Sequence, residues 1–387
     1  MADEQDLLPL GSSSHKYQLA QLEAGQIMRT ASAETVDVDA LAGQNSDVAV
    51  FVIGEQHDNL QCHLFQRDLI SALFKRHPRL VVGFEFFQRQ DNPALELFRS
   101  GKISAADLRR KTDWYQRTAG HFGYTEIVLE AVQRLRIPAI GLNVPRELVS
   151  AVSKGGIAAL DREQRALFPG VLISDPQHEF FIETTFGDFG VQVPLWFANI
   201  YAAQKCWDVV MAESMRLWLQ AKEHRGYKGV IIAGSGHVAY GLGIPFRLRR
   251  AAPRTRVATV VPVAVSPKKK GDEKQENPML KAIASQLKPV AIFSRGIADY
   301  VLALAPEARP HFPVIGFSGK MNAEGHYEVS GVEKEGIADR NGIRAGDIIL
   351  SLDGVPIKSL EALRLILAQK NWNDPLQFEI RRRIEIK

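Results

Sequence analysis

The sequence is poor in the features that mark several large classes of protein. It contains only two cysteines, Cys62 and Cys206, and so few cysteines exclude a disulfide framework. Their spacing also does not match a CxxC metal-binding motif. Its longest apolar stretches, such as 257–265, are far shorter than the roughly 20 residues that span a bilayer. The formal net charge is only +4, from 48 basic and 44 acidic residues. This surplus is too small to predict nucleic-acid binding or a polybasic membrane anchor.

The beginning of the chain also lacks the apolar segment of a signal peptide. Residues 1–6 read MADEQD, which is an acidic stretch. As it stands, the sequence therefore predicts a cytoplasmic protein, unless a leader has been removed.

Apolar and charged residues occur in the proportions of an ordinary globular protein, at 45% and 24%. Continuous apolar runs alternate with segments of helical periodicity, and the last of these helices runs from 195 to about 223. Such runs are typical of strands buried on both faces of a parallel sheet. The sequence therefore predicts an α/β domain with a largely parallel sheet flanked by helices. The predicted strands are 48–53, 80–84, 137–142, 230–233, 257–265 and 300–304.

Two changes in composition divide the chain. Residues 266–278 are charged and lack aromatics, which predicts a flexible surface insertion. Prolines at 306, 310 and 313 form a stiff connector, and the residues beyond it have the short strands and glycine-rich turns of a small, mainly β domain. We therefore expect an α/β domain at 1–309 and a second domain at 310–387.

Polar side chains follow four of the predicted strands, at the point where each strand ends. In strand order they are Glu55, His57 and Asp58, then Glu85, then Asn143, then His237. Because the carboxyl ends of parallel strands meet at one edge of a sheet, we expect these groups to share a cleft. Each has a structural explanation when taken alone, such as helix capping by Asp58. Their repetition at four strand ends favours a functional site.

The two glutamates and two histidines of this set fit two kinds of chemistry. They would hold a divalent metal ion through oxygen and nitrogen ligands. Alternatively, they would act as acid and base on a water molecule. The long helix adds Gln204 and Asp208, a polar pair within an apolar stripe, which needs partners in the cleft or in the neighbouring backbone.

Five motifs spread over the first domain fit one known family. They are GEQHDN at 54–59, GFE at 83–85, GLNVP at 141–145, AQKCWDVVMAESM at 203–215 and GSGHVAYGLGIPFRL at 234–248. Together they resemble the ChaN-like haem-binding uptake family of the Tiki superfamily, over about 48–304. The resemblance implies a role in iron uptake, with haem bound between two protomers of a homodimer. It also implies membrane attachment through a leader, which this sequence does not contain.

The resemblance does not identify the residue that binds the haem iron. Haem iron takes an axial ligand from Tyr, His, Cys or Met side chains. The candidates in this sequence are Tyr240, Tyr124, His121 and His237. The wider superfamily also includes hydrolases and metal-dependent peptidases, which implies a catalytic role for the glutamates and histidines of the cleft.

The second domain carries its own set of motifs. VIGF at 314–317, NGIRAGDII at 341–349 and LDGVPI at 352–357 resemble a PDZ domain of the bacterial periplasmic-protease type. A peptide would add to its sheet as a strand, with the terminal carboxylate held by backbone N–H groups of Ile315, Gly316 and Phe317. The helix that follows supplies three leucines, either to the peptide pocket or to the core: Leu360, Leu363 and Leu367.

The sequence thus favours a haem- or iron-handling protein with a peptide-docking PDZ domain. The alternatives are a hydrolase that works through the cleft, with or without a metal, and a scaffold in which only the PDZ domain functions. Haem binding predicts a broad apolar pocket. Hydrolysis predicts that the glutamates and histidines converge on one point.

Overall fold

The computed structural model describes residues 4–118, 120–186, 194–265, 289–307 and 309–382. The chain forms two compact units, each continuous in space but not in sequence. The first contains Met1–His57, Gln61–Ser104 and Ile127–Glu307, and the second contains Asp58–Leu60, Ala105–Glu126 and Ala308–Lys387. The surface insertion predicted at 266–278 lies outside the described residues.

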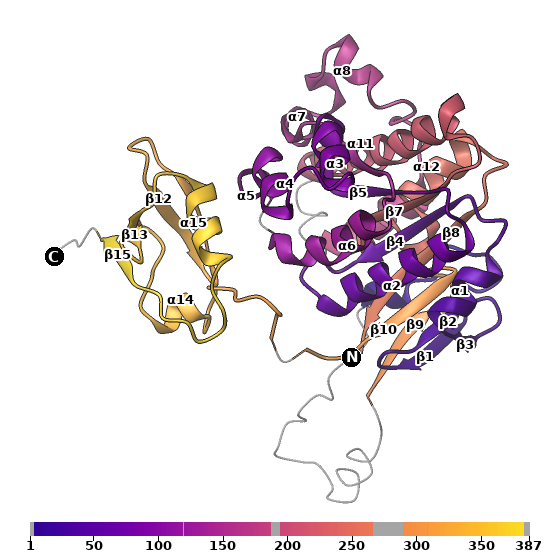
Figure 1. Cartoon of the computed structure of the whole chain (residues 1–387), viewed down its shortest axis with the longest axis horizontal. Coiled ribbons are helices and arrows are strands. Elements are labelled where there is room, and N and C mark those ends of the chain that lie inside the picture. The colour runs from indigo at the N-terminus through magenta and orange to yellow at the C-terminus, as the bar shows by residue number, and fades with distance from the viewer. Residues whose placement is uncertain (1–3, 119, 187–193, 266–288, 308, 383–387) are drawn as a thin grey trace, which may run out of the picture. The chain divides into compact units, whose positions relative to one another are not determined.

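The first unit is built on an eight-stranded sheet with the order β3-β2-β10-β8-β4-β7-β5-β6 (Figure 1). The six strands from β10 to β6 run parallel, and β2 and β3 extend one edge in antiparallel pairing. The predicted α/β fold with a largely parallel sheet is therefore confirmed. A separate ribbon pairs β1 with β9. The strands are β1 Leu19–Glu23, β2 Ile27–Arg29, β3 Glu34–Val36, β4 Val50–Glu55, β5 Leu80–Gln88, β6 Ala139–Asn143, β7 Lys228–Gly234, β8 Val257–Ala264, β9 Val290–Ser294 and β10 Tyr300–Leu304.

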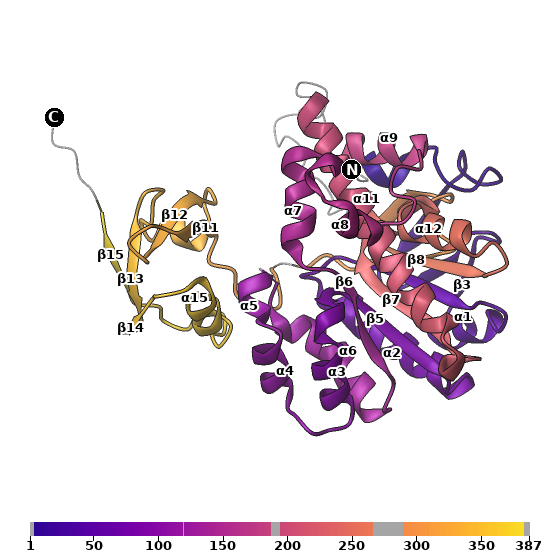
Figure 2. The same cartoon turned by 90° about the horizontal axis from the view of Figure 1, so that it is seen from above.

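Helices cover both faces of this sheet, which explains why its central strands are apolar along their whole length. Figure 2 shows α11 and α12 on one face and α2 and α3 on the other. None of the described helices is long and apolar enough to cross a membrane. The helices are α1 Val38–Gln44, α2 Leu60–Arg76, α3 Asn92–Arg99, α6 Phe122–Arg134, α7 Arg146–Gly155, α8 Arg162–Ala166, α9 Pro176–Phe186, α11 Pro194–Gln220 and α12 Ile244–Ala251, with short 3₁₀ turns η1 Glu4–Leu7, η2 Arg89–Asp91, η3 Ile157–Ala159, η4 Lys222–His224, η5 Ser235–His237 and η6 Ala239–Gly241.

The second unit is built on a small antiparallel sheet with the order β11-β12-β13-β14, in which β15 also pairs with β13. Its apolar core includes Tyr327, Val329, Ile349 and Leu363. This is the mainly β second domain that the sequence predicts. Its elements are β11 Phe317–Met321, β12 Tyr327–Val332, α14 Ile337–Arg340, β13 Ile348–Leu352, β14 Val355–Pro356, α15 Leu360–Leu367 and β15 Phe378–Arg381.

A stretch from the first third of the chain, with α4 (Ala105–Lys111) and α5 (Trp114–Arg117), belongs to the same unit. The guanidinium of Arg364 on α15 donates hydrogen bonds to the carbonyl groups of Tyr115 and Thr118, both at 2.8 Å. The ring of His121 donates to the carbonyl of Ala368 at 3.1 Å. These bonds hold the end of α5 against α15.

Gly141 is a sensitive point of the sheet, because β6 there passes the irregular end of β5. A Cβ atom at 141 would overlap the backbone of Gln88, which has no room to move. We expect Gly141→Ala to lower the free energy of unfolding in urea by about 1–3 kcal/mol. Gly236→Ala is the control, since a Cβ there meets nothing within 4 Å. It should change the same free energy by less than about 1 kcal/mol, and equal effects would contradict the overlap argument.

Candidate functional site

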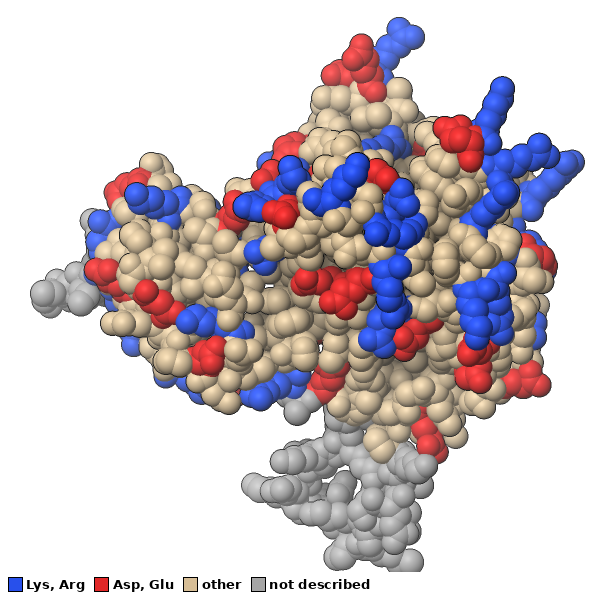
Figure 3. All heavy atoms as spheres, viewed as in Figure 1, with Lys and Arg blue, Asp and Glu red and all other residues tan. Residues whose placement is uncertain are grey.

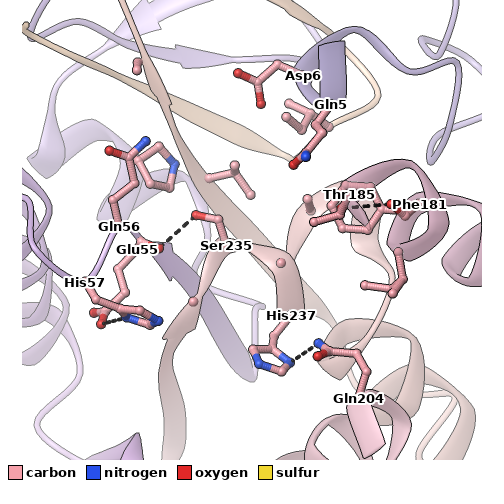
Figure 4. Close-up of a pocket in the computed structure, with 18 of the residues that line it drawn as sticks. Gln5, Asp6, Glu55, Gln56, His57, Phe181, Thr185, Gln204, Ser235 and His237 are labelled. Carbon is pink, nitrogen blue, oxygen red and sulfur yellow. Dashed lines mark hydrogen bonds and ion pairs between the residues drawn. The ribbon is translucent and has the colours of Figure 1, made fainter. Parts of the chain in front are cut away.

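The carboxyl ends of β4, β7 and β8 open into a cavity of about 740 Å³ (Figure 4). It lies at the sheet edge where the sequence predicts a cleft, and helix α9 and the N-terminal η1 also contribute to its wall. Its polar lining groups include Glu55, His57, Gln204, Ser235 and His237. Its apolar lining residues are Phe181, Ile182, Ala239, Val261, Pro262, Ala264, Val265 and Ile297.

Glu55 and His57 form the first polar pair of the cavity. The Glu55 carboxylate accepts hydrogen bonds from His57 Nδ1 and Gln66 Nε2, both at 2.8 Å. The carboxylate is buried, whereas the His57 side chain is 44% exposed. The Nε2 edge of the ring lies over Gly234, where an added Cβ would come within 3.1 Å of that nitrogen. Glycine at 234 therefore leaves the space that the imidazole occupies.

Glu85 and His237 form the second pair, with Asp208 behind it. One Glu85 oxygen accepts a hydrogen bond from the Gly234 backbone N–H at 2.7 Å. The other lies 3.6 Å from His237 Nε2. His237 Nδ1 donates to the Asp208 carboxylate at 2.6 Å. The glutamates and histidines of the predicted cleft are thus gathered around the turn at Gly234.

In the second pair, the negative charge of Glu85 and the positive charge of His237 stabilise each other. Burial alone would raise the pKa of Glu85, but the adjacent imidazolium of His237 outweighs it and lowers this pKa to about 2. Burial would lower the pKa of His237, but the carboxylates of Glu85 and Asp208 raise it to about 10. His237 is therefore a fixed cation at neutral pH.

The first pair behaves in the same way. Burial would lower the pKa of His57, but its hydrogen bond to Glu55 and the nearby carboxylates raise it overall. Burial would raise the pKa of Glu55, but the bond from His57 and the proximity of His63 lower it. Both carboxylates therefore stay ionised at neutral pH, and a ligand that needs neutral His57 must compete with a proton.

A metal site is not formed by these groups. Among the described residues, no cluster of three or more His, Cys, Asp or Glu side chains has an arrangement that would hold a metal ion. The carboxylates are instead occupied by imidazoles, by Gln66 and by the Gly234 backbone. The site suits acid–base chemistry or ligand binding better than a metal held by protein side chains alone.

The other residues predicted for the cleft divide into two groups. Gln204 lines the cavity, and its amide lies 2.8 Å from His237 Nδ1. Asn143 supports the cleft from outside, because its amide donates to the Glu85 carbonyl at 2.7 Å. Asp58 is exposed on the turn before α2 and is not among the lining residues.

The haem-ligand candidates are scattered. Only His237 lines the cavity. Tyr240 is buried beside it, and its hydroxyl donates to the Gln5 carbonyl and accepts from the Leu8 N–H. Tyr124 and His121 belong to the second unit, where the Tyr124 hydroxyl accepts from the His311 N–H and the His121 ring stacks on Phe312.

The predicted peptide-binding residues lie around one end of the small sheet. Gly316 has φ +83°, a conformation that favours glycine, and Phe317 begins the edge strand β11. Ile315 and Leu363 are buried in the core of the unit. Leu360 and Leu367 are partly buried against that core, so the leucines of α15 serve packing at least in part.

Several residues that shape the cavity were not among the predicted site residues. Gln66 holds the Glu55 carboxylate from α2, and the Ser235 hydroxyl donates to the Glu55 carbonyl at 3.2 Å. Gln5 and Asp6 line the cavity from η1, a segment for which the sequence predicted no helix or strand. Gln66 lies only 11 positions from Glu55, whereas Ser235 and the N-terminal residues depend on contacts between distant parts of the chain.

The fold and the cavity define an α/β protein whose strand ends carry paired carboxylates and imidazoles, followed by a PDZ domain. The chain belongs to the family described as haem-binding uptake, Tiki superfamily, ChaN, whose model matches residues 41–248. The PDZ family model matches residues 313–381. A search of curated proteins found no match.

The chain also matches solved structures at low sequence identity. The chain resembles the structure titled "Cofacial heme binding to ChaN of Campylobacter jejuni", with 16% identity and a TM-score of 0.51, over 71% of this chain and 95% of that one. A mutant of the erythromycin esterase EreC matches at 10% identity and a TM-score of 0.43, over 75% and 98%. The type III effector HopBA1 matches at 13% and 0.37, over 70% and 94%. At these identities the likeness is one of fold, and function has to be argued from the site.

The Glu85–His237 pair makes the stability of the protein depend on pH in a defined window. The lowered pKa of Glu85 contributes stability above about pH 4.5 that is lost as the pH falls toward 2. The raised pKa of His237 contributes stability below about pH 6.5 that is lost as the pH rises toward 10. We expect Glu85→Gln to lower the free energy of unfolding most between these limits, by about 3 kcal/mol, and less at pH 3 and pH 9.

Urea unfolding of both proteins at pH 3, 5.5 and 9 measures this difference. Glu147→Gln, on the exposed face of α7, is the matched control and should leave the profile unchanged. A Glu85→Gln deficit that is the same at all three pH values would show that the pair is not linked to stability as described.

Proposed function

We propose that the cavity at the strand ends binds haem, and that the protein acts in haem or iron uptake. Membership of the haem-binding uptake family supports this proposal. The cavity volume of about 740 Å³ is also within the usual range for sites of cofactors and other small molecules. The proposal depends mainly on His57. Its imidazole is held in a fixed orientation by the bond to Glu55 and lines the same cavity as the apolar residues.

The wall suits the flat, apolar face of a porphyrin. Phe181 and Ile182 contribute from α9, Val261 and Pro262 from β8, and Ile297 from the turn before β10. Haem would supply an iron atom that a protein nitrogen or oxygen could bind. The residues present therefore fit the group that the family binds.

His57 is the side chain best placed to hold that iron. Its Nδ1–H is donated to Glu55, the arrangement by which a carboxylate usually orients a metal-ligating histidine. The other ring nitrogen, Nε2, is therefore left to bind the iron, and the His57 side chain is 44% exposed. His237 is less suitable, because carboxylates approach both of its ring nitrogens. We accordingly propose His57 rather than the four candidates chosen from the sequence.

A haemin titration followed by visible absorption tests this assignment. We expect a saturable Soret shift for the full chain and a loss of at least tenfold in affinity for His57→Ala, since about 1.4 kcal/mol corresponds to a factor of ten. Affinity should also rise with pH, because iron displaces the proton that the raised pKa keeps on His57. His326→Ala, in the second unit, is the control and should bind like the parent protein.

Two results would contradict this proposal. Absence of any saturable shift would reject haem binding. An unchanged affinity for His57→Ala would reject His57 as the ligand. The number of haem molecules per chain, measured together with the oligomeric state, also checks the homodimer that the family resemblance predicts.

A second candidate function is hydrolysis without a metal. Its support is the convergence of two imidazole–carboxylate pairs on Gly234. In this arrangement His57 would accept a proton from water and the charged His237 would stabilise a developing negative charge. Ester and amide substrates, assayed with the parent protein and His57→Asn, test it. Hydrolysis that persists in His57→Asn would show that another site is responsible.

For the second unit we propose that the PDZ domain docks a peptide or protein C-terminus. β11 lies at the edge of its sheet, and the left-handed Gly316 precedes it on the loop that would bind the carboxylate. A peptide would pair with β11 through backbone hydrogen bonds.

A displayed library of peptides with free carboxyl ends tests the docking proposal on the full chain. We expect selected peptides to lose about tenfold or more in affinity when the C-terminus is amidated. Gly316→Ala should weaken binding as well, because it strains the loop. Gly325→Ala is the matched control, with φ +74° in the β11–β12 turn. Peptides that bind equally well after amidation would rule out recognition of a free C-terminus.

A further inference from the structure

The N-terminal segment contributes to the wall of the cavity, although it lies far from the other lining residues in sequence. Residues Glu4–Leu7 form the 3₁₀ turn η1, which contacts β9 and α9. Its Gln5 and Asp6 side chains are among the lining residues, and Figure 4 shows both of them beside the cavity. None of the residues of η1 is buried. The segment therefore lies at the surface, beside β9 and α9.

The Tyr240 hydroxyl makes two hydrogen bonds to the backbone of this segment. Its hydroxyl donates to the Gln5 carbonyl at 2.5 Å and accepts from the Leu8 N–H at 3.0 Å. The ring is 3% exposed and packs edge-on against Phe181 of the cavity wall. A single side chain thus bridges both ends of the stretch from 5 to 8.

The backbone fixes Tyr240 in this position. Tyr240 has φ +60°, which is uncommon for a residue other than glycine and persists only where the surroundings enforce it. Its N–H donates to the carbonyl of Ile297, which also lines the cavity. The hydroxyl is therefore aimed at the N-terminal segment by a local conformation that costs energy.

A fixed point follows directly after the segment. Gly11 has φ +77°, and a Cβ atom there would overlap the carbonyl group of Gly296. The Gly11 N–H donates to the side chain of Gln177 on α9 at 3.2 Å. The chain is thus closely packed at Gly11. Residues 4–7 lie at the surface, Leu8 packs against the hydrophobic core, and Tyr240 binds both ends of the stretch from 5 to 8.

We propose that residues 4–8 are a strap over the cavity and that the Tyr240 hydroxyl is its latch. A ligand enters when both hydrogen bonds of the latch open and the strap swings away from α9 about Gly11. The identity of the ligand rests on the proposed haem function. The movement of the strap does not depend on that function. Its movement is testable without any ligand.

Thiol labelling measures the opening of the strap. Cys62 and Cys206 are both buried, so Asp6→Cys introduces a single half-buried thiol, whose reaction with DTNB becomes faster when the strap opens. Adding Tyr240→Phe removes both hydrogen bonds, and we expect it to raise the labelling rate about tenfold. Tyr201→Phe is the matched control, because its hydroxyl also donates to a buried backbone carbonyl, that of Asp175, but does not touch the strap.

A second variant keeps the test independent of any damage at position 240. Leu8→Pro removes the N–H that donates to Tyr240 and leaves the tyrosine intact. It should also raise the labelling rate of the thiol at position 6. Equal labelling rates in the parent, Tyr240→Phe and Leu8→Pro proteins would overturn the strap.

Stopped-flow mixing with haemin then relates the strap to the proposed function. We expect faster haemin association when the latch is removed, in the same order of variants as the labelling rates. If haemin does not bind at all, the proposed haem function is rejected. The labelling rates still test whether the strap opens. Loss of the haem spectrum in Tyr240→Phe with unchanged labelling would instead make Tyr240 an iron ligand and overturn its role as a latch.

Discussion

The cavity depends on the pairing of charges that the fold removes from water. Three carboxylates and two imidazoles gather at the ends of parallel strands, where each isolated charge would be costly. Asp208 and Glu85 approach His237 from two sides, and the second oxygen of Glu85 is bound by the Gly234 backbone. This carboxylate therefore ties β5 to the turn after β7. The same bonds that neutralise the charges fix the shape of the cavity.

This pairing also bears on the two candidate functions proposed for the cavity. A general base works best when its pKa lies near the working pH, but the carboxylates of the site are ionised well below it and His237 is protonated well above it. The site is closer to a preorganised set of fixed charges than to a set of groups that exchange protons. His57, which is partly exposed, is the group that a ligand or a water molecule would engage.

The sequence predicted the sheet and the positions of its strand ends well, because both follow from local patterns. Apolar runs marked the strands, and polar residues after them marked the edge. Glu85 shows the limit of such reasoning, since β5 continues through it to Gln88 with an irregular register. Whether a polar residue ends a strand or bends it depends on the neighbouring strand.

The contacts that the sequence did not predict have the same cause. Tyr124 and His121 lie in the sequence between segments of the α/β domain, yet they pack with residues near 311 and 368. Ser235 and the first residues of the chain line the cavity, and Gln66 supports it from α2, through contacts that the sequence alone did not predict. The short strands β1 and β2 were missed because their partners, β9 and β10, lie more than 250 residues away.

The docking of α5 on α15 has a consequence for the order in which the protein folds. Arg364 and the carbonyl group that it binds on Tyr115 are separated by 249 positions in the chain. During synthesis the stretch around α5 is made long before its partner, and its buried aromatic residues must wait for the last part of the chain. Closing so long a loop is slow, and domains completed earlier fold first. The final step of folding is therefore expected to be the capture of a segment that left the ribosome among the first third of the residues.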